Sequence, residues 1–429
     1  MTSALLPAAA SHPPQEPALL SQYRHVRSAT EAMVADLSDA DATVQSMDDA
    51  SPAKWHLAHT TWFFEEFVLG ARLPDYEPVD PQYRYLFNSY YEAVGARHPR
   101  PRRGLLTRPS LDEVLAYREA VDEAMESLLM RAQTDDEAAL ITLGLHHEQQ
   151  HQELLLTDIL HLFAQNPLRP AYAPTLPSPV IADPRPAPEW IAFPGGVVTI
   201  GHSGDGFAFD CEGPRHQVLL HPYLLCSHPV SNHQWFEFIE DGGYQSTGLW
   251  LSDGWRWVCD NQIEAPLYWE ERDGTWWQMT LRGMQPVDPD SPVTHVSFFE
   301  ADAFARWAER RLPTEAEWEH AAHNLPATGN FAEGRALRPL PDRQNTAGSL
   351  RQMFGDVWEW TGSAFLPYPR FRPREGAVGE YNGKFMSSQM VLRGGSCVTA
   401  ESHIRASYRN FFYPHQRWQF TGVRLADDV

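Results

Sequence analysis

The chain has 429 residues, enough for two or more domains with sizeable hydrophobic cores. Its formal net charge of −22 and its pI near 5.2 argue against a nucleic-acid or anionic-membrane surface, so small molecules are the expected partners. Its four cysteines form no CxxC pair and imply neither a disulfide framework nor a zinc ribbon, and no apolar run reaches the roughly 18 residues of a membrane helix. We therefore expect a cytoplasmic protein without a membrane, nucleic-acid or obligate protein partner.

The first half of the chain is dominated by helical patterns. Residues 1–18 are rich in Ala and Pro and lack both a basic start and an apolar core, which predicts a disordered tail and not a signal peptide. The periodicity of apolar residues then predicts four helices, over residues 19–45, 52–71, 110–132 and 135–164. We expect Ser51 followed by Pro52 to begin the second helix, and a Ser110–Glu113 capping box to begin the third. Four helices predict a bundle over residues 19–165, a common setting for metal sites.

Two histidines of the predicted helix 135–164 suggest a metal site. His147 and His151, within the segment His146-His-Glu-Gln-Gln-His-Gln-Glu, lie four residues apart and therefore share one face of the helix. Two imidazoles on one rigid face can hold a single metal ion. The Glu that follows His147 is also a feature of zinc proteases, whose third ligand lies further along the chain. The alternative is that each histidine only caps or fills a helix surface.

A third ligand is available on the predicted helix 52–71. That helix carries His56 and His59, and His59 lies deeper in it, close to the aromatic Trp62 and Phe63. We therefore favour His59 as the third ligand and expect His56 beside the site or at the surface. The predicted metal ligands are thus His59, His147 and His151.

The second half of the chain has a different character. Eight prolines fall within residues 166–188, where they cannot sustain a helix, so this segment is expected to be a linker. Residues 189–429 are rich in Gly, Trp and short β-like runs such as Val197-Val-Thr-Ile. Capping boxes at Ser297–Glu300 and Thr314–Glu317 predict two helices among them. We see no internal repeat and expect an α+β domain.

Several motifs of residues 189–429 together carry a family resemblance: Phe193-Pro-Gly-Gly, Arg311-Leu-Pro-Thr-Glu-Ala-Glu-Trp-Glu, Gly355-Asp-Val-Trp-Glu-Trp-Thr, Arg393-Gly-Gly-Ser and Gly422-Val-Arg. This half resembles the formylglycine-generating-enzyme (sulfatase-modifying factor) fold, which is C-type-lectin-like, and the first half resembles DinB-like four-helix bundles. The implied fold class is multidomain, α and α+β. A copper-type formylglycine generator needs two cysteines near its C-terminus, and here Cys397 stands alone, which argues against that activity.

The combination of the two halves with the three histidines resembles the ergothioneine-biosynthetic sulfoxide synthases, which are non-haem iron enzymes. The resemblance implies an Fe(II)- and O2-dependent enzyme that joins a thiol to C2 of the imidazole of hercynine, giving a sulfoxide. A three-histidine site leaves three positions free on octahedral Fe(II), enough for hercynine, the thiol and O2. The implied partners are these small molecules and the cofactor Fe(II).

The family also implies a catalytic phenol. It lies either in a loop corresponding to Asn88-Ser-Tyr-Tyr or after the Trp-Glu-Trp motif, where this chain has Phe365. The proton donor is therefore expected to be Tyr90 or Tyr91, although paired loop tyrosines can also serve only packing.

Substrate selectivity is read from the same resemblance. Relatives that use γ-glutamylcysteine carry an Asp and an Arg where this chain has Phe412 and Gln416, so cysteine is the expected thiol. Arg100 and Arg103 are expected to bind its carboxylate, or else to form a solvated loop cluster.

The resemblance further assigns two ends of a hercynine site. Gln150 and Tyr368 are expected at the trimethylammonium group, and Asn410 and Phe411 at the carboxylate. By contrast, Trp358 and Trp360 are expected in the core.

Three classes of function remain open at this point. The first is the iron sulfoxide synthase, including a related ovothiol- or selenoneine-type synthase. The second is a zinc-dependent hydrolase or thiol transferase on a DinB-like bundle. The third is a non-catalytic lectin-like binding module with a bundle attached. Metal identity separates the first from the others.

Overall fold

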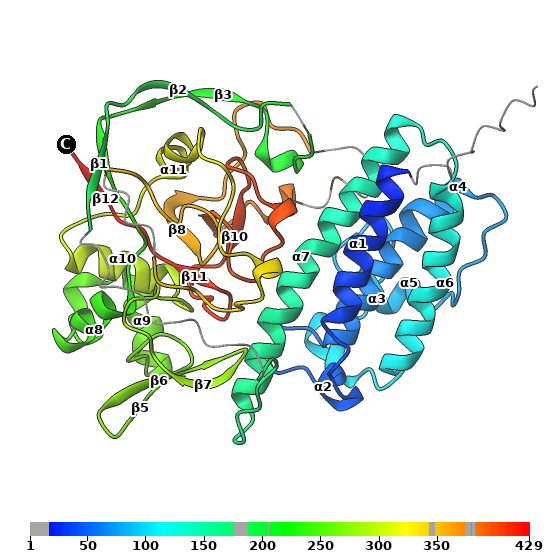
Figure 1. The fold of residues 1–429 in the computed structure, drawn as a ribbon, viewed down its shortest axis with the longest axis horizontal. Coiled ribbons are helices and arrows are strands. Elements are labelled where there is room, and N and C mark those ends of the chain that lie inside the picture. Colours follow the sequence, from blue (N-terminus) through cyan, green and yellow to red (C-terminus); the bar gives the residue numbers. More distant parts are fainter. Residues whose placement is uncertain (1–16, 175–187, 205, 343–347, 374–378, 380–381) are drawn as a thin grey trace, which may run out of the picture.

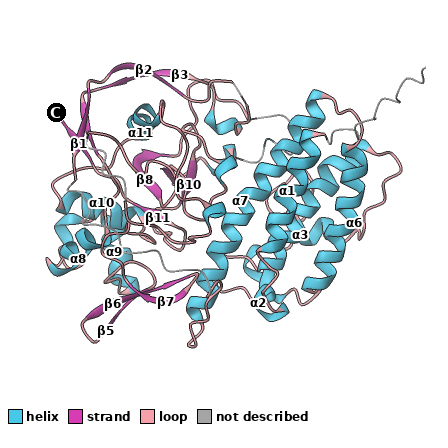
Figure 2. Cartoon of the chain, in the orientation of Figure 1, coloured by secondary structure: helices cyan, strands magenta, loops and turns pink. Residues whose placement is uncertain are grey.

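The computed structural model describes residues 17–174, 188–204, 206–342, 348–373, 379 and 382–429. A helical domain, up to Gln165, lies beside a mixed C-terminal domain that starts at Trp190, and helix α7 (Asp135–Gln165) runs between them (Figure 1). Helices dominate the first part and strands are confined to the second (Figure 2), so the predicted fold class is confirmed. Most of the predicted tail 1–18 and much of the predicted linker 166–188 fall outside the described residues, so these boundaries stay predictions.

Helices α1 (Ala18–Ala32), α3 (Ala53–Phe64), α6 (Leu111–Leu129) and α7 form the bundle. The prediction of one helix over residues 19–45 is wrong. The first helix ends at Ala32, and a second one, α2 (Asp39–Thr43), follows. The side chain of Ser38 forms a capping box with Asp41 at the start of α2. After α3, the helix continues as a π-turn, η1 (Glu65–Leu69), and α4 (Gly70–Arg72).

The helix starts follow their sequence signals with one exception. Ser110 and Glu113 form the predicted capping box of α6, and Thr134 with Glu137 forms another at α7. Ser51, however, does not cap α3. Pro52 occupies the N-cap position, and the Ser51 hydroxyl instead accepts a hydrogen bond from Arg103 at 2.9 Å.

Helices α3 and α7 approach closely at Gly144. A Cβ atom added there would lie 2.6 Å from Cε1 of Phe64 and 2.9 Å from Cε1 of Phe63, closer than real side chains pack. The missing side chain therefore lets α7 settle directly on the aromatic side of α3. This contact lies one turn before His147, so it sets the distance between the two helices that carry the predicted ligands.

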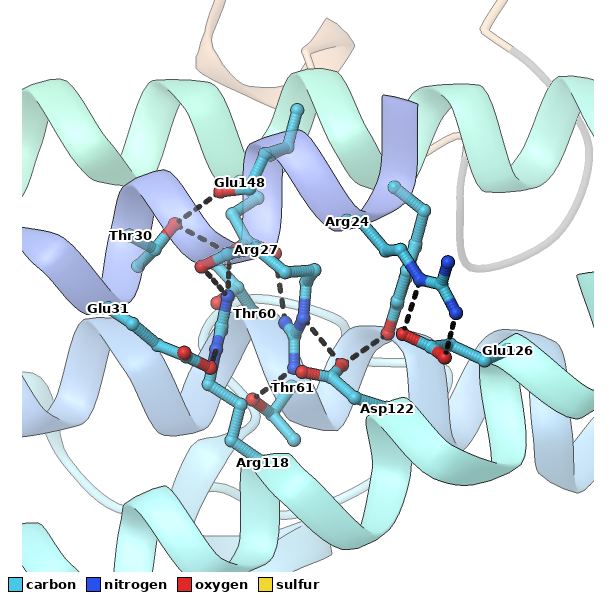
Figure 3. A network of polar contacts seen from close by, with 12 residues as sticks. Arg24, Arg27, Thr30, Glu31, Thr60, Thr61, Arg118, Asp122, Glu126 and Glu148 are labelled. Carbon is cyan, nitrogen blue, oxygen red and sulfur yellow. Dashed lines mark hydrogen bonds and ion pairs between the residues drawn. The ribbon is translucent and has the colours of Figure 1, made fainter. Parts of the chain in front are cut away.

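A buried ionic network fixes α7 to the other helices of the bundle (Figure 3). The fully buried carboxylate of Glu148 accepts hydrogen bonds from Arg27 of α1 at 2.9 Å, from Thr30 of α1 at 2.6 Å, and from Arg118 of α6. Arg27 also bonds to Asp122 of α6 at 2.7 Å. Two helices, α1 and α6, thus hold one side chain of α7, which specifies the rotation of α7 about its own axis.

Two shorter helices lie between the second and third helices of the bundle. They are α5 (Tyr83–Phe87) and the 3-10 helix η2 (Arg100–Leu105). Among the described residues, no helix has both the length and the apolar character that crossing a membrane requires.

The centre of the C-terminal domain is a four-stranded sheet in the order β10 (Asn410–Phe412), β9 (Met390–Arg393), β8 (Trp358–Ala364) and β11 (Thr421–Gly422). The first three strands pair antiparallel, and β11 pairs parallel to β8. Helices α10 (Phe298–Trp307) and α11 (Glu315–Ala322) pack on this sheet and begin with the two predicted capping boxes. Trp358 and Trp360 are fully buried, which confirms their predicted place in the core.

Smaller elements surround this sheet. One three-stranded sheet contains β1 (Trp190–Phe193), β4 (Tyr223–Cys226) and β12 (Ala426–Asp428), and another contains β5 (Trp269–Arg272), β6 (Thr275–Thr280) and β7 (Gly283–Pro286). The remaining elements are the hairpin of β2 (Gly196–Ile200) and β3 (His216–Leu220), and the helices α8 (Asn232–Glu240) and α9 (Ser252–Asn261).

Removal of the Glu148 carboxylate should destabilise the helical domain strongly. In Glu148→Ala, two buried guanidinium groups would lose their shared partner, and breaking a buried pair on one side typically costs about 3–5 kcal/mol. Glu126→Ala is the matched control, because Glu126 pairs with Arg24 at the exposed side of the same network, where a pair contributes up to about 1 kcal/mol. Chemical denaturation measures both free energies of unfolding, and equal losses would contradict this account.

Candidate metal centre

The three predicted ligands lie together between α3 and α7. The ligand atoms of His59, His147 and His151 are all within 4.8 Å of one another, and the three side chains are buried. The Nε2 atoms of His59 and His147 are 3.2 Å apart. The ring of His59 lies between those of Trp55, at 4.6 Å, and Trp62, at 5.6 Å, which hold it rigidly.

The spacing of the nitrogens suits a metal ion. Two imidazole nitrogens about 2.1 Å from one ion would be about 3.0 Å apart at a right angle and about 3.4 Å apart at a tetrahedral angle. The observed 3.2 Å falls between these values. Three imidazole donors suit Fe, Zn, Cu or Ni and not Mg or Ca, which prefer oxygen.

Outer hydrogen bonds direct the metal-facing nitrogen of two of the histidines. Nδ1 of His59 donates to the carbonyl oxygen of Phe87 at 2.6 Å, which leaves the lone pair on Nε2. Nδ1 of His151 lies 2.8 Å from Nδ1 of His56, and Nε2 of His56 lies 3.1 Å from the carboxylate of Asp158. His56 is therefore buried beside the site, as one of its two sequence-based alternatives proposed.

Burial keeps the three imidazoles neutral, which is the form that binds a metal. It lowers the pKa of His147 to about 3. It also lowers the pKa values of His59 and His151 well below the usual range, and the neighbouring imidazoles lower them further.

Glu148 is not arranged as the base of a zinc protease, although it stands between the two histidines in the order His-Glu-x-x-His. Burial opposes its ionisation, but the guanidinium groups of Arg118 and Arg27 outweigh burial and lower its pKa to about 2. The carboxylate is held by α1 and α6 and is too weak a base to activate water. This observation argues against the zinc hydrolase alternative.

Tyr91 and Tyr90 lie at different depths. Tyr91 is fully buried, and its ring contacts Phe67 at 5.0 Å and Trp62 at 5.8 Å. Because Trp62 stacks on His59, Tyr91 is one aromatic ring away from a predicted ligand. Tyr90 is half-buried and points to the C-terminal domain, where Lys384 lies over its ring at 5.1 Å.

The two arginines predicted to bind a carboxylate differ in environment. Arg100 is exposed and donates to the carbonyl of Asp49. Arg103 is buried, with its guanidinium carbon 3.3 Å from the centre of the Trp55 ring, so a solvated loop cluster is the wrong description of it. Burial and the charge of Arg100 lower the pKa of Arg103. Among the described residues, Arg103 has no carboxylate within ion-pair distance, and its Nε atom has no hydrogen-bond partner.

Of the residues predicted at the hercynine and thiol ends, Gln150 and Gln416 bond across the contact between the domains. Gln150 of α7 donates to the hydroxyl of Tyr408 at 2.5 Å, and Gln416 donates to Asp49 at 3.3 Å. Asn410 and Phe411 lie in β10, and the side-chain oxygen of Asn410 accepts a hydrogen bond from the backbone N–H of Phe411. Phe412, which follows them, packs edge-on against Trp418 with 5.8 Å between ring centres.

Phe365, which occupies the alternative tyrosine position, stacks on Phe411 at 4.1 Å. The contacts of Tyr368 are with residues other than the three predicted metal ligands. Its hydroxyl accepts a hydrogen bond from Arg393 at 3.0 Å, Arg409 lies over its ring at 4.0 Å, and His216 packs against it. All of these contacts lie within the C-terminal domain.

Sequence reasoning missed several residues beside the predicted site. Within two helical turns of His151, α7 bonds to the C-terminal domain through residues that were not predicted. They are Asp158, which bonds to Trp418, Glu153, which bonds to Trp358, and Tyr408, which bonds to Gln150. One signal was available, because Asp158 is the one acidic residue in the Leu- and Ile-rich segment from Leu154 to Leu162. A carboxylate in such a run must have buried partners.

Comparison with known proteins covers both domains. Residues 22–164 match the DinB superfamily, and residues 178–349 and 333–429 match the sulfatase-modifying factor enzyme 1-like domain. The chain is 33% identical to the hercynine oxygenase of Mycolicibacterium thermoresistibile, over 97% of this chain and 96% of that protein. It is also 33% identical to the hercynine oxygenase of Mycolicibacterium smegmatis, over 92% of this chain and 95% of that protein. The formylglycine-generating enzyme of Thermomonospora curvata is 29% identical, over 57% of this chain and 97% of its own length.

Replacement of either helix-α7 histidine should abolish stoichiometric metal binding. In His147→Ala or His151→Ala, two imidazoles remain, and the loss of one ligand removes the site without removing a charge from the core. Metal analysis after anaerobic reconstitution with Fe(II), with circular dichroism as the check on folding, measures the effect. His161→Ala, on the same helix but bonded to Ser46, is the control. Full metal retention in both variants would reject the assignment.

Proposed function

The chain belongs to the hercynine oxygenase family, and we propose that it is an Fe(II)- and O2-dependent sulfoxide synthase of ergothioneine biosynthesis, acting in the cytoplasm. It would join cysteine to C2 of the hercynine imidazole and give hercynylcysteine sulfoxide. The observation that carries this proposal is the cluster of His59, His147 and His151 in a chain similar to hercynine oxygenases over nearly its whole length. A zinc hydrolase would lack its base here, because the carboxylate of Glu148 forms ion pairs with Arg27 and Arg118.

Fe(II) bound by three imidazoles would supply three further coordination positions, where hercynine, a thiolate and O2 can meet. The chain's own residues would orient these molecules. The aromatic pair Trp55 and Trp62 clamps His59, and Gly144 lets α7 lie close enough for His147 to face it. Productive geometry would then depend on these packed side chains and not on a mobile loop.

Arg103 is suited to bind the carboxylate of the thiol substrate. It is a buried cation without a carboxylate partner among the described residues, so it would gain strongly from an anion. Its guanidinium lies against Trp55, and the same indole stacks on His59. This arrangement supports a carboxylate held one ring away from the metal. Arg100, which is exposed, would contribute a weaker attraction.

The choice of cysteine rests on Phe412 and Gln416. Neither residue can form an ion pair with the added α-amino and carboxylate groups of γ-glutamylcysteine. Gln416 already bonds to Asp49 of the helical domain, and Phe412 packs on Trp418 within the C-terminal domain, so both side chains have partners.

For hercynine, Gln150 lies next to His151 in the chain, and its bond to Tyr408 would hold it at the domain contact. Phe411, with Asn410 beside it, lies one ring away from that contact, because it packs on Phe385, which in turn packs on Tyr90. Gln150 and Tyr368 would approach the trimethylammonium group, and Asn410 and Phe411 the carboxylate; Tyr368 would need contacts beyond those that it makes within the C-terminal domain.

Aerobic incubation with Fe(II), hercynine and equal concentrations of cysteine and γ-glutamylcysteine tests the reaction and the thiol together. We expect a product with the mass of hercynylcysteine sulfoxide and a specificity constant that favours cysteine. No sulfoxide of either thiol would reject the proposed reaction. A tenfold preference for γ-glutamylcysteine, equivalent to about 1.4 kcal/mol, would reject only the choice of thiol.

The loop with Tyr90 and Tyr91 should supply the proton that O2 reduction requires. We expect the double change to Phe at both positions to bind iron and both substrates normally and to lose sulfoxide synthesis by about 10²–10⁴-fold, the usual cost of losing a general acid. Tyr85→Phe, an exposed tyrosine of the same segment, is the control. The single variants show which phenol acts. Sulfoxide synthesis near the wild-type rate in the double variant would mean that the proton comes from elsewhere, such as water.

A further inference from the structure

Asp158 of α7 is a junction between the two domains. Its Oδ2 atom accepts hydrogen bonds from the backbone N–H of Ser51 at 2.8 Å and from Nε2 of His56 at 3.1 Å. Its Oδ1 atom accepts a hydrogen bond from Nε1 of Trp418, at 3.1 Å. Asp158, His56 and Trp418 are all buried. Trp418 belongs to the C-terminal domain, and the other groups belong to the helical domain.

Trp418, Asp158, His56 and His151 form a series of hydrogen bonds. The direction of each bond follows from the chemistry of Trp418 and Asp158. An indole N–H can only donate, and a carboxylate can only accept. His56 must therefore donate to Asp158 through Nε2, which leaves the lone pair on its Nδ1. That lone pair faces Nδ1 of His151 at 2.8 Å, so His151 must donate there. The remaining lone pair of His151, on Nε2, is then free to face His59 and His147.

We infer that Trp418, Asp158 and His56 are positioning residues that fix the tautomer and the direction of His151 as a metal ligand. The inference rests on the proposed metal site. It means that the C-terminal domain completes a centre whose three ligands all belong to the helical domain. A ligand histidine commonly donates its other ring N–H to an acceptor that fixes its orientation. Here that acceptor is a second histidine, itself fixed from the other domain.

The series Trp418, Asp158 and His56, called the relay below, also connects His151 with Phe412, which is proposed to select the thiol. The ring of Trp418 packs edge-on against Phe412, with 5.8 Å between ring centres. A group that binds beside Phe412 would therefore contact the residue that holds Asp158 in place. The thiol segment and the metal ligand are thus parts of one hydrogen-bonded and packed unit.

Four variants of the full chain test the relay. His56→Phe removes the acceptor of the His151 N–H and keeps a ring of similar size. His56→Gln restores an amide oxygen that can accept and an amide N–H that can donate. Trp418→Phe removes the indole N–H and keeps a smaller aromatic ring. Trp358→Phe is the matched control, because Trp358 also donates across the domain contact to a carboxylate of α7, Glu153, at 2.5 Å.

The first measurement is the dissociation constant for Co(II), determined by competition with a chelator, with thermal unfolding of the metal-free chain as the check on folding. Loss of such an outer hydrogen bond typically weakens metal binding about 10–100-fold, which we expect for His56→Phe. We expect a smaller loss for Trp418→Phe, and about threefold or less for His56→Gln and for the Trp358→Phe control. Wild-type affinity in His56→Phe would overturn the relay. So would an equal loss in Trp418→Phe and Trp358→Phe, which would indicate a general effect of the domain contact.

The second measurement needs no metal. Long-range ¹H–¹⁵N correlation spectra of the metal-free chain, labelled with ¹⁵N-histidine, should show His151 protonated at Nδ1 in the wild type and in His56→Gln. His56→Phe should shift His151 toward the Nε2-protonated form, because Nδ1–H has lost its acceptor. An unchanged tautomer in His56→Phe would overturn the inference. A wild type that binds no metal would instead reject the proposed function, and the tautomer would still decide the relay.

Discussion

The placement of Glu148 between two buried arginines is the constraint on which the rest of the structure depends. Helix α7 is 31 residues long and touches both domains, so its rotation about its axis decides which side chains face which domain. Arg27 and Arg118 hold the Glu148 carboxylate from α1 and α6, respectively. With that direction fixed, His147 and His151 turn toward α3. Such a pair need not add net stability over apolar residues, but a rotated α7 would leave the buried Glu148 carboxylate without its partners and would take from Arg27 and Arg118 the carboxylate that they share.

The opposite side of α7 is used to attach the C-terminal domain. His146, Gln149, Gln150 and Glu153 follow helical spacing along one face, and each forms a hydrogen bond across the domain contact. Their partners all come from Trp358 or from residues 396–408. Burial raises the pKa of Glu153, while the hydroxyl of Thr399 and the indole of Trp358 act against this by stabilising the carboxylate. One helix thus carries two of the three predicted metal ligands and these polar contacts between domains, so the position of the C-terminal domain is set relative to the metal ligands themselves.

The sequence predicted what depends on spacing along one helix, and failed where partners come from distant segments. The i, i+4 pair of His147 and His151 and the capping box of Ser110 are local patterns, and the structure has both. The break after Ala32 was missed because apolar periodicity continues across the two short helices. Nothing local distinguishes Arg103, which is buried against Trp55, from its exposed neighbour Arg100.

The order His-Glu-x-x-His illustrates why a motif alone does not decide chemistry. In a zinc protease the Glu faces the metal and acts as a base, whereas here Arg27 and Arg118 hold the carboxylate of Glu148 toward α1 and α6. The two arginines are 91 residues apart in sequence and meet only in the folded bundle. The same five letters therefore serve two purposes in this chain: the histidines provide ligands, and the Glu between them provides the rotation that makes those ligands converge. For Glu148 to act as a base, its side chain would have to leave Arg27 and Arg118 and turn toward the metal, and two buried guanidinium groups would lose the carboxylate that they share.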